Sequence, residues 1–224
     1  MNVFFNLFSI NNIFFSFHGY QMSYLEFVGT LLNLWSVWLV TKNNVLTWPV
    51  GNIAVILFGF LFYQIRLYSD LVEQVYFLIT GFYGWWVWLY LRKRGMNSRG
   101  DLPVTFNSGL SNKIYIGIII VGTALMGYAM GHIHLYMPSL FPEKASFPYL
   151  DAFTTVMSFA ANILMAHKKI ECWYLWIAVD IIGIGLYFAK GVVFVSLLYL
   201  IFLILATKGL FNWRKLVNLV GQIA

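Results

Sequence analysis

A carboxylate, two indoles and a phenol recur at helical spacing inside one apolar stretch of this sequence. The intervals of three, four, three and four residues would place all members on one helical face: Trp173, Trp176, Asp180, Gly183 and Tyr187. An aspartate near the centre of a bilayer costs about 2.5–3.5 kcal/mol on insertion scales, so a partner should offset it. The neighbouring apolar stretches carry no Lys or Arg at that depth. The pattern therefore predicts a site for a cationic ring, to which each indole adds about 0.5–2 kcal/mol of cation–π attraction.

Structural roles for the same face stay open. Asp180 could bond a Tyr or Trp of another helix, and Trp173 could anchor its helix at the membrane interface.

Further polar side chains inside apolar stretches extend the candidate site. Glu73 and Gln74 stand side by side, and Trp85 recurs on the helical face of Gln74. Gln74 can hydrogen-bond an amide or a sugar in either direction. Asn52 and Asn162 are candidates for lining a cavity, or alternatively for bonding helices to one another.

Catalytic chemistry has little support in the sequence. No nucleophile–base constellation, phosphate-binding loop or complete set of metal ligands is visible, and the pair His132 and His134 has no apparent third ligand. Cys172 is the only cysteine, which excludes an internal disulfide framework and a cysteine metal cage. We therefore predict that the protein is not an enzyme and holds neither metal nor cofactor. An enzyme acting on lipid would need Glu26 and Asp151 to meet in one cavity.

The composition is that of a membrane protein. Sixty-one per cent of the 224 residues are hydrophobic, 10% are charged, and the mean hydropathy is +0.77. An ordinary soluble domain is about 45–50% apolar and about 25% charged. The net charge of +6 sits in short loops between apolar stretches, which indicates membrane topology rather than nucleic-acid binding.

Seven apolar stretches reach the roughly 20 residues that span a bilayer. They cover approximately residues 23–41, 47–65, 69–91, 113–137, 149–166, 171–189 and 191–210. Residues 2–17 are rich in aromatics but interrupted by Asn11 and Asn12, and we expect a helix lying at the membrane interface there. Gly127 and Gly131 form a GxxxG motif, which predicts close packing with another helix or protomer.

With seven spans, 11 Lys and Arg residues fall on one side of the membrane and 3 on the other. The richer side is expected to be cytoplasmic, which leaves the N-terminus outside and the C-terminus inside.

An internal repeat relates residue i to residue i+125. The matching pairs include Tyr24 with Tyr149, Glu26 with Asp151, Thr30 with Thr155, Trp48 with Trp173, Gly84 with Gly209 and Trp88 with Trp213. A three-span unit ends on the side opposite its start, so a copy in the same orientation needs a linking span. The predicted fold is therefore all-α, with two parallel three-helix repeats in a 3+1+3 arrangement and the substrate between them. Its parts are an interfacial segment (1–20), repeat 1 (21–91), a cytoplasmic loop and linker helix (92–137), repeat 2 (138–210) and a cytoplasmic tail (211–224).

Several strings resemble the PnuC family of vitamin transporters over about residues 20–215. They are FVGTLLNLW, WPVGNI, FGFLFYQIRLYSDLVEQVYF, FYGWWVW and the long run from Leu150 to Phe202. The resemblance implies a SWEET-like fold, often a trimer, that carries nicotinamide riboside, thiamine or riboflavin by facilitated diffusion, with phosphorylation trapping the vitamin inside. It also implies a central pocket that includes Gln74, Trp173, Trp176 and the aromatic Tyr199. Some members have asparagine at the positions of Asp180 and Ala54 and none at that of Asn162, so the choice of vitamin stays open.

We therefore expect a uniporter for a small cationic vitamin in the bacterial cytoplasmic membrane, with nicotinamide riboside first and thiamine or riboflavin as alternatives. The expected partners are the vitamin, the lipid bilayer and two further copies in a homotrimer, with no nucleic acid. A non-transporting membrane assembly subunit is the alternative from another class.

Overall fold

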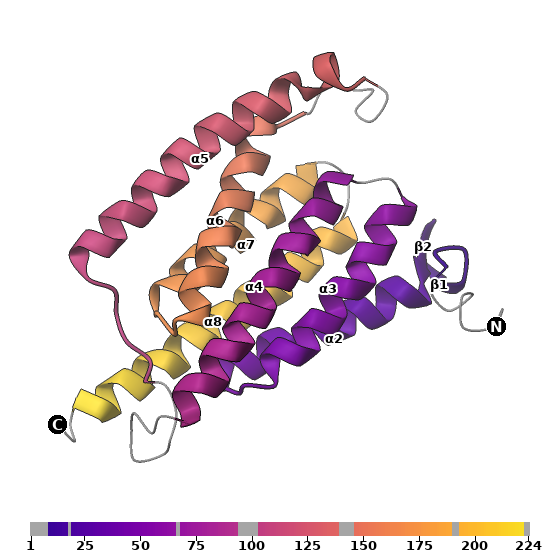
Figure 1. The fold of residues 1–224 in the computed structure, drawn as a ribbon. Helices are drawn as coiled ribbons and strands as arrows, with labels where there is room; N and C mark the ends of the chain where they lie inside the picture. The colour runs from indigo at the N-terminus through magenta and orange to yellow at the C-terminus, as the bar shows by residue number, and fades with distance from the viewer. Residues whose placement is uncertain are drawn as a thin grey trace. The chain divides into compact units, whose positions relative to one another are not determined.

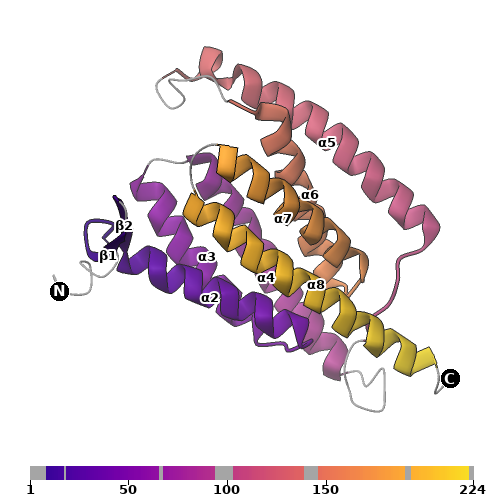
Figure 2. The same cartoon turned by 180° about the vertical axis from the view of Figure 1, so that it is seen from behind.

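A computed structural model describes residues 9–17, 19–65, 68–93, 103–138, 146–189 and 193–221 (Figures 1 and 2). These residues form a two-stranded hairpin and seven helices: β1 (Ile13–Phe17), β2 (Tyr20–Ser23), α2 (Tyr24–Thr41), α3 (Thr47–Gln64), α4 (Tyr68–Lys93), α5 (Gly109–Tyr136), α6 (Pro148–Ala166), α7 (Glu171–Ala189) and α8 (Val193–Gly221). The chain divides into two compact units, Met1–Leu102 and Pro103–Ala224. The prediction of an all-α membrane protein with seven helices is confirmed, and each helix overlaps one predicted span.

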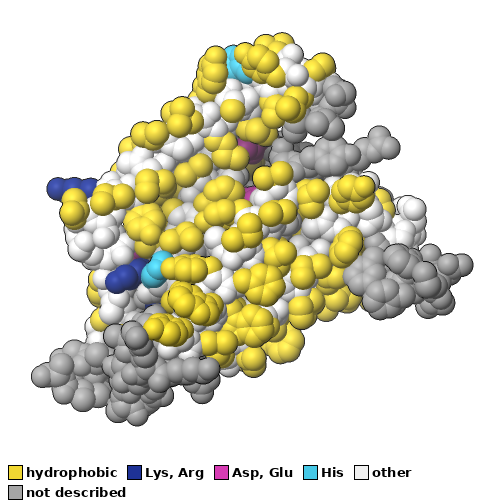
Figure 3. All heavy atoms as spheres, in the orientation of Figure 1, with side chains coloured by type: hydrophobic (Ala, Val, Ile, Leu, Met, Phe, Trp, Pro, Cys, Tyr) yellow, Lys and Arg dark blue, Asp and Glu magenta, His cyan; other side chains and the backbone are white. Residues whose placement is uncertain are grey.

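Six of these helices are long and apolar enough to cross a membrane by composition and length: α2, α3, α5, α6, α7 and α8. The first turns of α4 carry Asp70, Glu73 and Gln74, which lowers its hydropathy. Hydrophobic side chains cover most of the face drawn in Figure 3, as expected for a surface in contact with lipid. The bilayer is therefore the environment of this surface.

The N-terminal segment corrects one prediction. Residues 13–17, which we expected in an interfacial helix, form strand β1 and pair antiparallel with β2. Gly19 lies in the connecting turn with a φ of +83°, a conformation that glycine adopts without strain. The run of aromatic residues favours an extended strand once a partner strand is available. Residues 2–8 of the predicted helix lie outside the described residues.

The hairpin is tied to the helices of the first unit. Ser23 caps α2 by accepting a hydrogen bond from Glu26 N at 3.2 Å. The Tyr20 hydroxyl donates to the Glu26 carboxylate, and Ile10 N donates to Gln64 Oε1 at 3.2 Å. Burial, together with the Glu26 carboxylate, raises the pKa of Tyr20 above its usual range. The hairpin and the residues just before it thus join the start of α2 to the end of α3.

In the first unit α3 packs against both α2 and α4. Ser36 of α2 and Thr47 of α3 hold the first pair together, because each hydroxyl donates to the other residue's carbonyl oxygen, at 2.8 and 2.9 Å. Inside an apolar helix pair such bonds satisfy hydroxyls that would otherwise be costly to bury.

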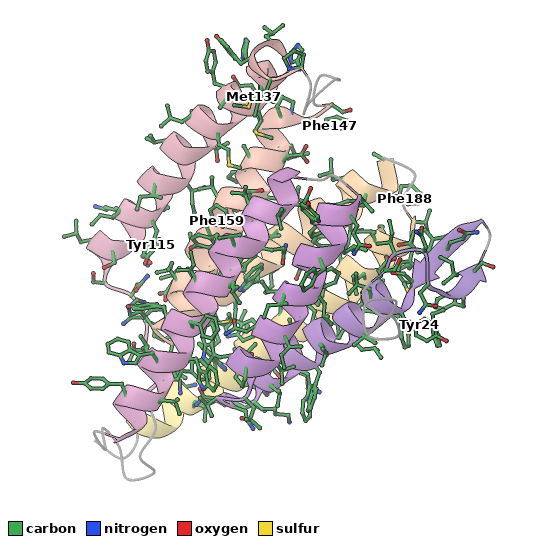
Figure 4. All side chains as sticks on the ribbon, turned by 45° about the vertical axis from the view of Figure 1, so that its right-hand side comes forward. Tyr24, Tyr115, Met137, Phe147, Phe159 and Phe188 are labelled. Atoms are coloured by element: carbon green, nitrogen blue, oxygen red, sulfur yellow. The ribbon has the colours of Figure 1, made fainter. Side chains whose placement is uncertain are left out.

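In the second unit α5 packs on α6, α6 on α7, and α7 on α8. The predicted GxxxG motif makes the α5–α6 contact: a Cβ at Gly127 would lie 2.4 Å from the Tyr149 ring, and one at Gly131 would lie 3.6 Å from Pro148. Figure 4 labels Tyr115 on α5 and Phe159 on α6. Tyr115 packs on the core cluster of this unit, which consists of Ile119, Val156, Met157, Ala160 and Val179.

The two corners that precede α3 and α7 share four backbone hydrogen bonds at the offset of 125. Asn43 N donates to Val40 O at 2.9 Å, and Lys168 N donates to Met165 O at 3.0 Å. Asn43 and Lys168 are both left-handed, with φ of 55° and 52°. Three further bonds match: Asn44 N to Leu39 O with Lys169 N to Leu164 O, Thr47 N to Asn44 O with Cys172 N to Lys169 O, and Trp48 N to Val45 O with Trp173 N to Ile170 O. The offset of 125 seen in the sequence therefore also relates the backbone structure of these two corners.

The second corner has a strap that sequence reasoning missed. Thr105 N donates to Lys168 O, and Ile170 N donates to Thr105 O, both at 3.1 Å. Asn107 N donates to both carboxylate oxygens of Glu171, at 3.0 and 3.1 Å. Residues 105–107 are therefore fixed to the start of α7.

Helix α8 is longer than its predicted span. It continues past residue 210 to Gly221, so the described part of the predicted tail is helical.

Candidate functional site

The predicted polar face of α7 lies against α8. Trp173 lies across Gly209, where a Cβ would come within 2.4 Å of the indole, and it meets Trp213 edge-on with 5.4 Å between ring centroids. Tyr199 lies across Gly183 in the same way, at 2.5 Å from a Cβ built there. Because these contacts fix the α7–α8 register, the turn of α7 that carries Asp180 lies between them.

Asp180 is buried at this packing face, with 4% of its surface exposed. The facing stretch of α8, residues 200–207, contains no charged side chain. Its neighbour Val179 packs with the α6 residues Val156 and Met157. Among the described residues no hydrogen bond or salt bridge reaches the Asp180 carboxylate. A buried carboxylate without such a partner is costly and is a functional candidate by default.

Two of the predicted aromatic residues flank Asp180. Trp176 lies one turn before it on α7 and is half-buried, packed on the core cluster of the second unit. Tyr199 packs on the same cluster, and its ring stacks on Tyr187 with 5.3 Å between centroids and 20° between planes. Trp176 and Asp180 thus lie one turn apart on α7, and Tyr199 of α8, which the resemblance and not the spacing suggested, packs on the same cluster as Trp176.

Asn162 is buried on α6, at 6% exposure. In the antiparallel pair α6–α7 it lies closer to the corner than Asp180 does. Counting from the corner, Asp180 is level with residues near Ser158, which is also buried. The structure therefore places the two predicted polar residues at different depths, roughly 7 Å apart along the helix axis at 1.5 Å per residue.

Asn52 is a buried polar residue in the second turn of α3, at 6% exposure. Its Oδ1 lies against Gly81 of α4, so close that a Cβ there would be 1.9 Å away. Its Nδ2 is buried and has no hydrogen-bond partner among the described residues. This close contact joins α3 to α4 at a position where an added Cβ would displace the amide.

The remaining predicted residues lie on α4. Glu73, Gln74 and Trp85 are all half-buried. Trp85 follows Gly84 in the chain. The Trp48 indole lies over Gly84, where an added Cβ would be 2.3 Å from the nearest indole atom.

The two repeats act as internal controls for one another, because features required by the shared fold should occur in both. Trp48 on Gly84 and Trp173 on Gly209 are such a shared feature, and both indole Nε1 atoms are buried without a partner among the described residues. Trp48 also meets Trp88 edge-on at 5.5 Å, as Trp173 meets Trp213. The spacing had marked Trp173 for the site, but its packing role is repeated in the first unit.

Other candidates differ between the repeats at the offset of 125. The pairs are Asn52 with Ile177, Val55 with Asp180, Val37 with Asn162, Gly51 with Trp176, Gln74 with Tyr199 and Gly81 with Ala206. The fold therefore does not require these polar and aromatic side chains at their positions. They are the better candidates for function, and comparison of the repeats is the signal in the sequence that separates them from packing residues.

Glu26 and Asp151, the carboxylates that a lipid-acting enzyme would need deep in a cavity, each lie at the end of a helix instead. Each lies in the first turn of its helix, and Glu26 accepts the hydrogen bond from Tyr20. Among the described residues, no three His, Cys, Asp or Glu side chains are grouped so that they could hold a metal ion.

The chain is similar in sequence and in fold to known membrane transporters. Residues 23–215 match the family described as nicotinamide mononucleotide transporter. The chain is 28% identical to the nicotinamide riboside transporter PnuC of Escherichia coli, over 87% of both chains. It is 27% identical to the riboflavin/roseoflavin transporter RibM of Streptomyces davaonensis, over 84% of this chain and 83% of that one. A crystal structure of the vitamin B3 transporter PnuC shares the fold, with a TM-score of 0.64 and 23% identity over 87% of this chain and 82% of that chain.

Proposed function

Since the chain belongs to the nicotinamide mononucleotide transporter family, and is thus a membrane vitamin transporter rather than an enzyme, we propose that it takes up nicotinamide riboside by uniport. The observation that carries this proposal is the buried Asp180 beside Trp176 and Tyr199. A carboxylate suits the positive pyridinium ring of the riboside, and aromatic side chains suit its faces.

The family description names nicotinamide mononucleotide, but the Asp180 carboxylate favours the unphosphorylated nicotinamide riboside as the cargo. A phosphate group adds about 1.5 to 2 negative charges at pH 7. The stretch of α8 that faces Asp180, residues 200–207, supplies no positive charge to balance it. A phosphorylated cargo would therefore be repelled where the uncharged ribose is accepted.

The proposed roles follow the differences between the repeats. Asp180 supplies the counter-charge, and Trp176 and Tyr199 stack on the ring. The other predicted residues bond the polar groups of the cargo or line its path: Asn52, Glu73, Gln74, Trp85 and Asn162. Trp173, which packs on Gly209, is assigned to the packing of α7 on α8.

Uniport suffices to accumulate a cation. A negative-inside potential is worth about 2.3 kcal/mol per charge per 100 mV, or roughly fifty-fold accumulation at that voltage. Phosphorylation of the vitamin inside the cell would add a further sink. The two repeats would rock around the site to alternate access.

The membrane context is proposed on the resemblance and on the 11-to-3 distribution of basic residues. The protein would be a homotrimer in the bacterial cytoplasmic membrane, with its N-terminus outside and its C-terminus inside. A cysteine placed at the exposed Lys215 should then react only with reagents applied from the cytoplasmic side.

Calorimetry on the purified protein tests the cargo. Nicotinamide riboside should bind, and nicotinamide mononucleotide and thiamine should bind more weakly. Riboflavin is the second candidate, because the relative RibM is a riboflavin/roseoflavin transporter. Tight thiamine binding without a response to nicotinamide riboside would overturn the ranking. No binding of any vitamin would instead favour a non-transporting assembly subunit.

Liposomes test the mechanism. Uptake of the riboside should follow an imposed potassium-diffusion potential and ignore proton or sodium gradients. Accumulation driven by a sodium gradient at zero potential would rule uniport out.

A further inference from the structure

The Asn52 side chain presents a hydrogen-bond donor that the protein itself leaves unused. The residue is 6% exposed, and its Nδ2 has no partner among the described residues. Leaving a buried amide donor unsatisfied is costly, and such a group in a native protein calls for an explanation.

Two hydroxyls close to Gly51 and Gly81 already take part in other hydrogen bonds. Gly51 lies against Ser36, whose hydroxyl is bonded to Thr47 at 2.8 Å. Thr80, next to Gly81, donates to Tyr76 O of its own helix at 2.9 Å. Neither hydroxyl bonds to Asn52 Nδ2, which has no hydrogen-bond partner among the described residues.

The fold does not require this amide. In the second repeat the positions equivalent at the offset of 125 hold two apolar residues, Ile177 and Ala206. In the first repeat Gly81 leaves room for the amide, since a Cβ there would lie 1.9 Å from Asn52 Oδ1. Asn52 thus depends on glycine at position 81, which leaves the space that its amide occupies.

We infer that Asn52, held in place by Gly81, donates a hydrogen bond to a carbonyl oxygen on the ring of the transported vitamin, and that this pair selects carbonyl-bearing rings. The inference rests on the proposed function. It adds which chemical group of the vitamin Asn52 recognises. A carbonyl oxygen is the matching partner, because it only accepts, whereas a ribose hydroxyl also needs an acceptor for its own hydrogen. The carboxamide of nicotinamide riboside meets this requirement.

Calorimetry on the full-length protein with two cations isolates this contact. Nicotinamide riboside carries the carboxamide, and pyridinium riboside lacks it but keeps the ring, the charge and the sugar. Asn52→Leu should weaken binding of nicotinamide riboside about tenfold and leave pyridinium riboside within about twofold of wild type. Asn33→Leu, the same chemical change on half-buried α2 surface of the same repeat, is the matched control and should leave the ratio of the two affinities unchanged.

A double variant guards against misfolding of the single one. Asn52→Ile with Gly81→Ala transplants the pair of the second repeat, and it should fold and show the same selective loss. Gly81→Ala alone should displace the amide and also lower the preference for the carboxamide. If wild type prefers nicotinamide riboside and the Asn52 variants keep that preference, the inference is overturned while the proposed function stands. If wild type binds neither riboside, or binds both equally, the inference is overturned as well, and absence of binding also removes the proposed function.

Discussion

Trp173 lies so closely across Gly209 that any side chain at 209 would meet its indole, and Trp48 lies across Gly84 in the same manner. The distances from a built Cβ to the nearest indole atom are 2.4 and 2.3 Å. This relationship fixes the contact between the second and third helices of both repeats. Its duplication makes it a property of the fold rather than of the cargo.

Substitution of either glycine by alanine should therefore loosen its repeat. Gly209→Ala and Gly84→Ala force an indole out of its place, and overpacking of this kind costs about 1–3 kcal/mol. Thermal unfolding in detergent should show a clear fall in midpoint for both. Gly185→Ala is the control, because a Cβ there meets nothing within 4 Å. Equal midpoints for all three variants would contradict the packing role.

The two tryptophans of α7 should separate in their effects. Trp173→Ala removes a side chain that is 1% exposed and should cost about 3–5 kcal/mol of unfolding free energy. Trp176→Ala should leave stability closer to wild type but weaken nicotinamide riboside binding about tenfold, because stacking of a ring on an aromatic side chain is worth about 1–3 kcal/mol. Unfolding and calorimetry on both variants measure the two effects. A binding loss confined to Trp173→Ala would reverse the assignment.

Asp180→Asn should weaken binding of the cationic cargo more than binding of a neutral analogue of the same shape. The substitution keeps the size of the side chain and removes the charge, and interactions with charged groups are worth about 1.5–3 kcal/mol. The affinity for nicotinamide riboside should fall about tenfold or more, whereas a neutral dihydropyridine analogue should be affected little. Asp151→Asn, in the first turn of α6, is the control. Equal losses for both ligands would show that Asp180 does not recognise charge.

The strap over the second corner should protect the start of α7. Glu171→Gln replaces the carboxylate that accepts two bonds from Asn107 N with a neutral amide, so the bond loses its charge assistance of about 1 kcal/mol. Hydrogen exchange at Thr105 N and Ile170 N should accelerate in this variant. Exchange at the equivalent corner around Asn43 should stay unchanged, and acceleration at both corners would point to general destabilisation.

The N-terminal hairpin should weaken at high pH. The folded state raises the pKa of Tyr20, so it binds the phenol proton more tightly than the unfolded chain does. This contribution to stability is complete below the ordinary tyrosine pKa of about 10 and is lost as pH rises above it. Aromatic ring signals of Phe14 and Phe27, which stack at 4.4 Å, should report the loss. Tyr20→Phe should lack the Tyr20 part of this pH dependence, and an identical profile in wild type and variant would refute the link.

Much of the fold could be predicted from the sequence, because the lengths of apolar runs and the offset of 125 are local or one-dimensional properties. Each predicted span overlaps a helix, and Gly127 and Gly131 pack as their spacing indicated. The helical spacing on α7 also brought Trp176 and Asp180 onto one face. In a membrane protein the hydrophobic length of a segment is nearly sufficient to fix a helix, since the backbone must satisfy its own hydrogen bonds.

The tertiary structure decided everything that depends on contacts between distant segments. Residues 13–17 became a strand because β2 offers a partner, and Thr105 became part of a strap because the α6–α7 corner offers backbone groups 63 to 65 residues away. The sequence could not show that the Trp173 indole occupies the space over Gly209. Nor could it show that the Nδ2 of Asn52, beside Gly81, has no hydrogen-bond partner among the described residues. Those facts depend on which side chains meet across helices, and periodicity within one helix carries no information about its neighbour.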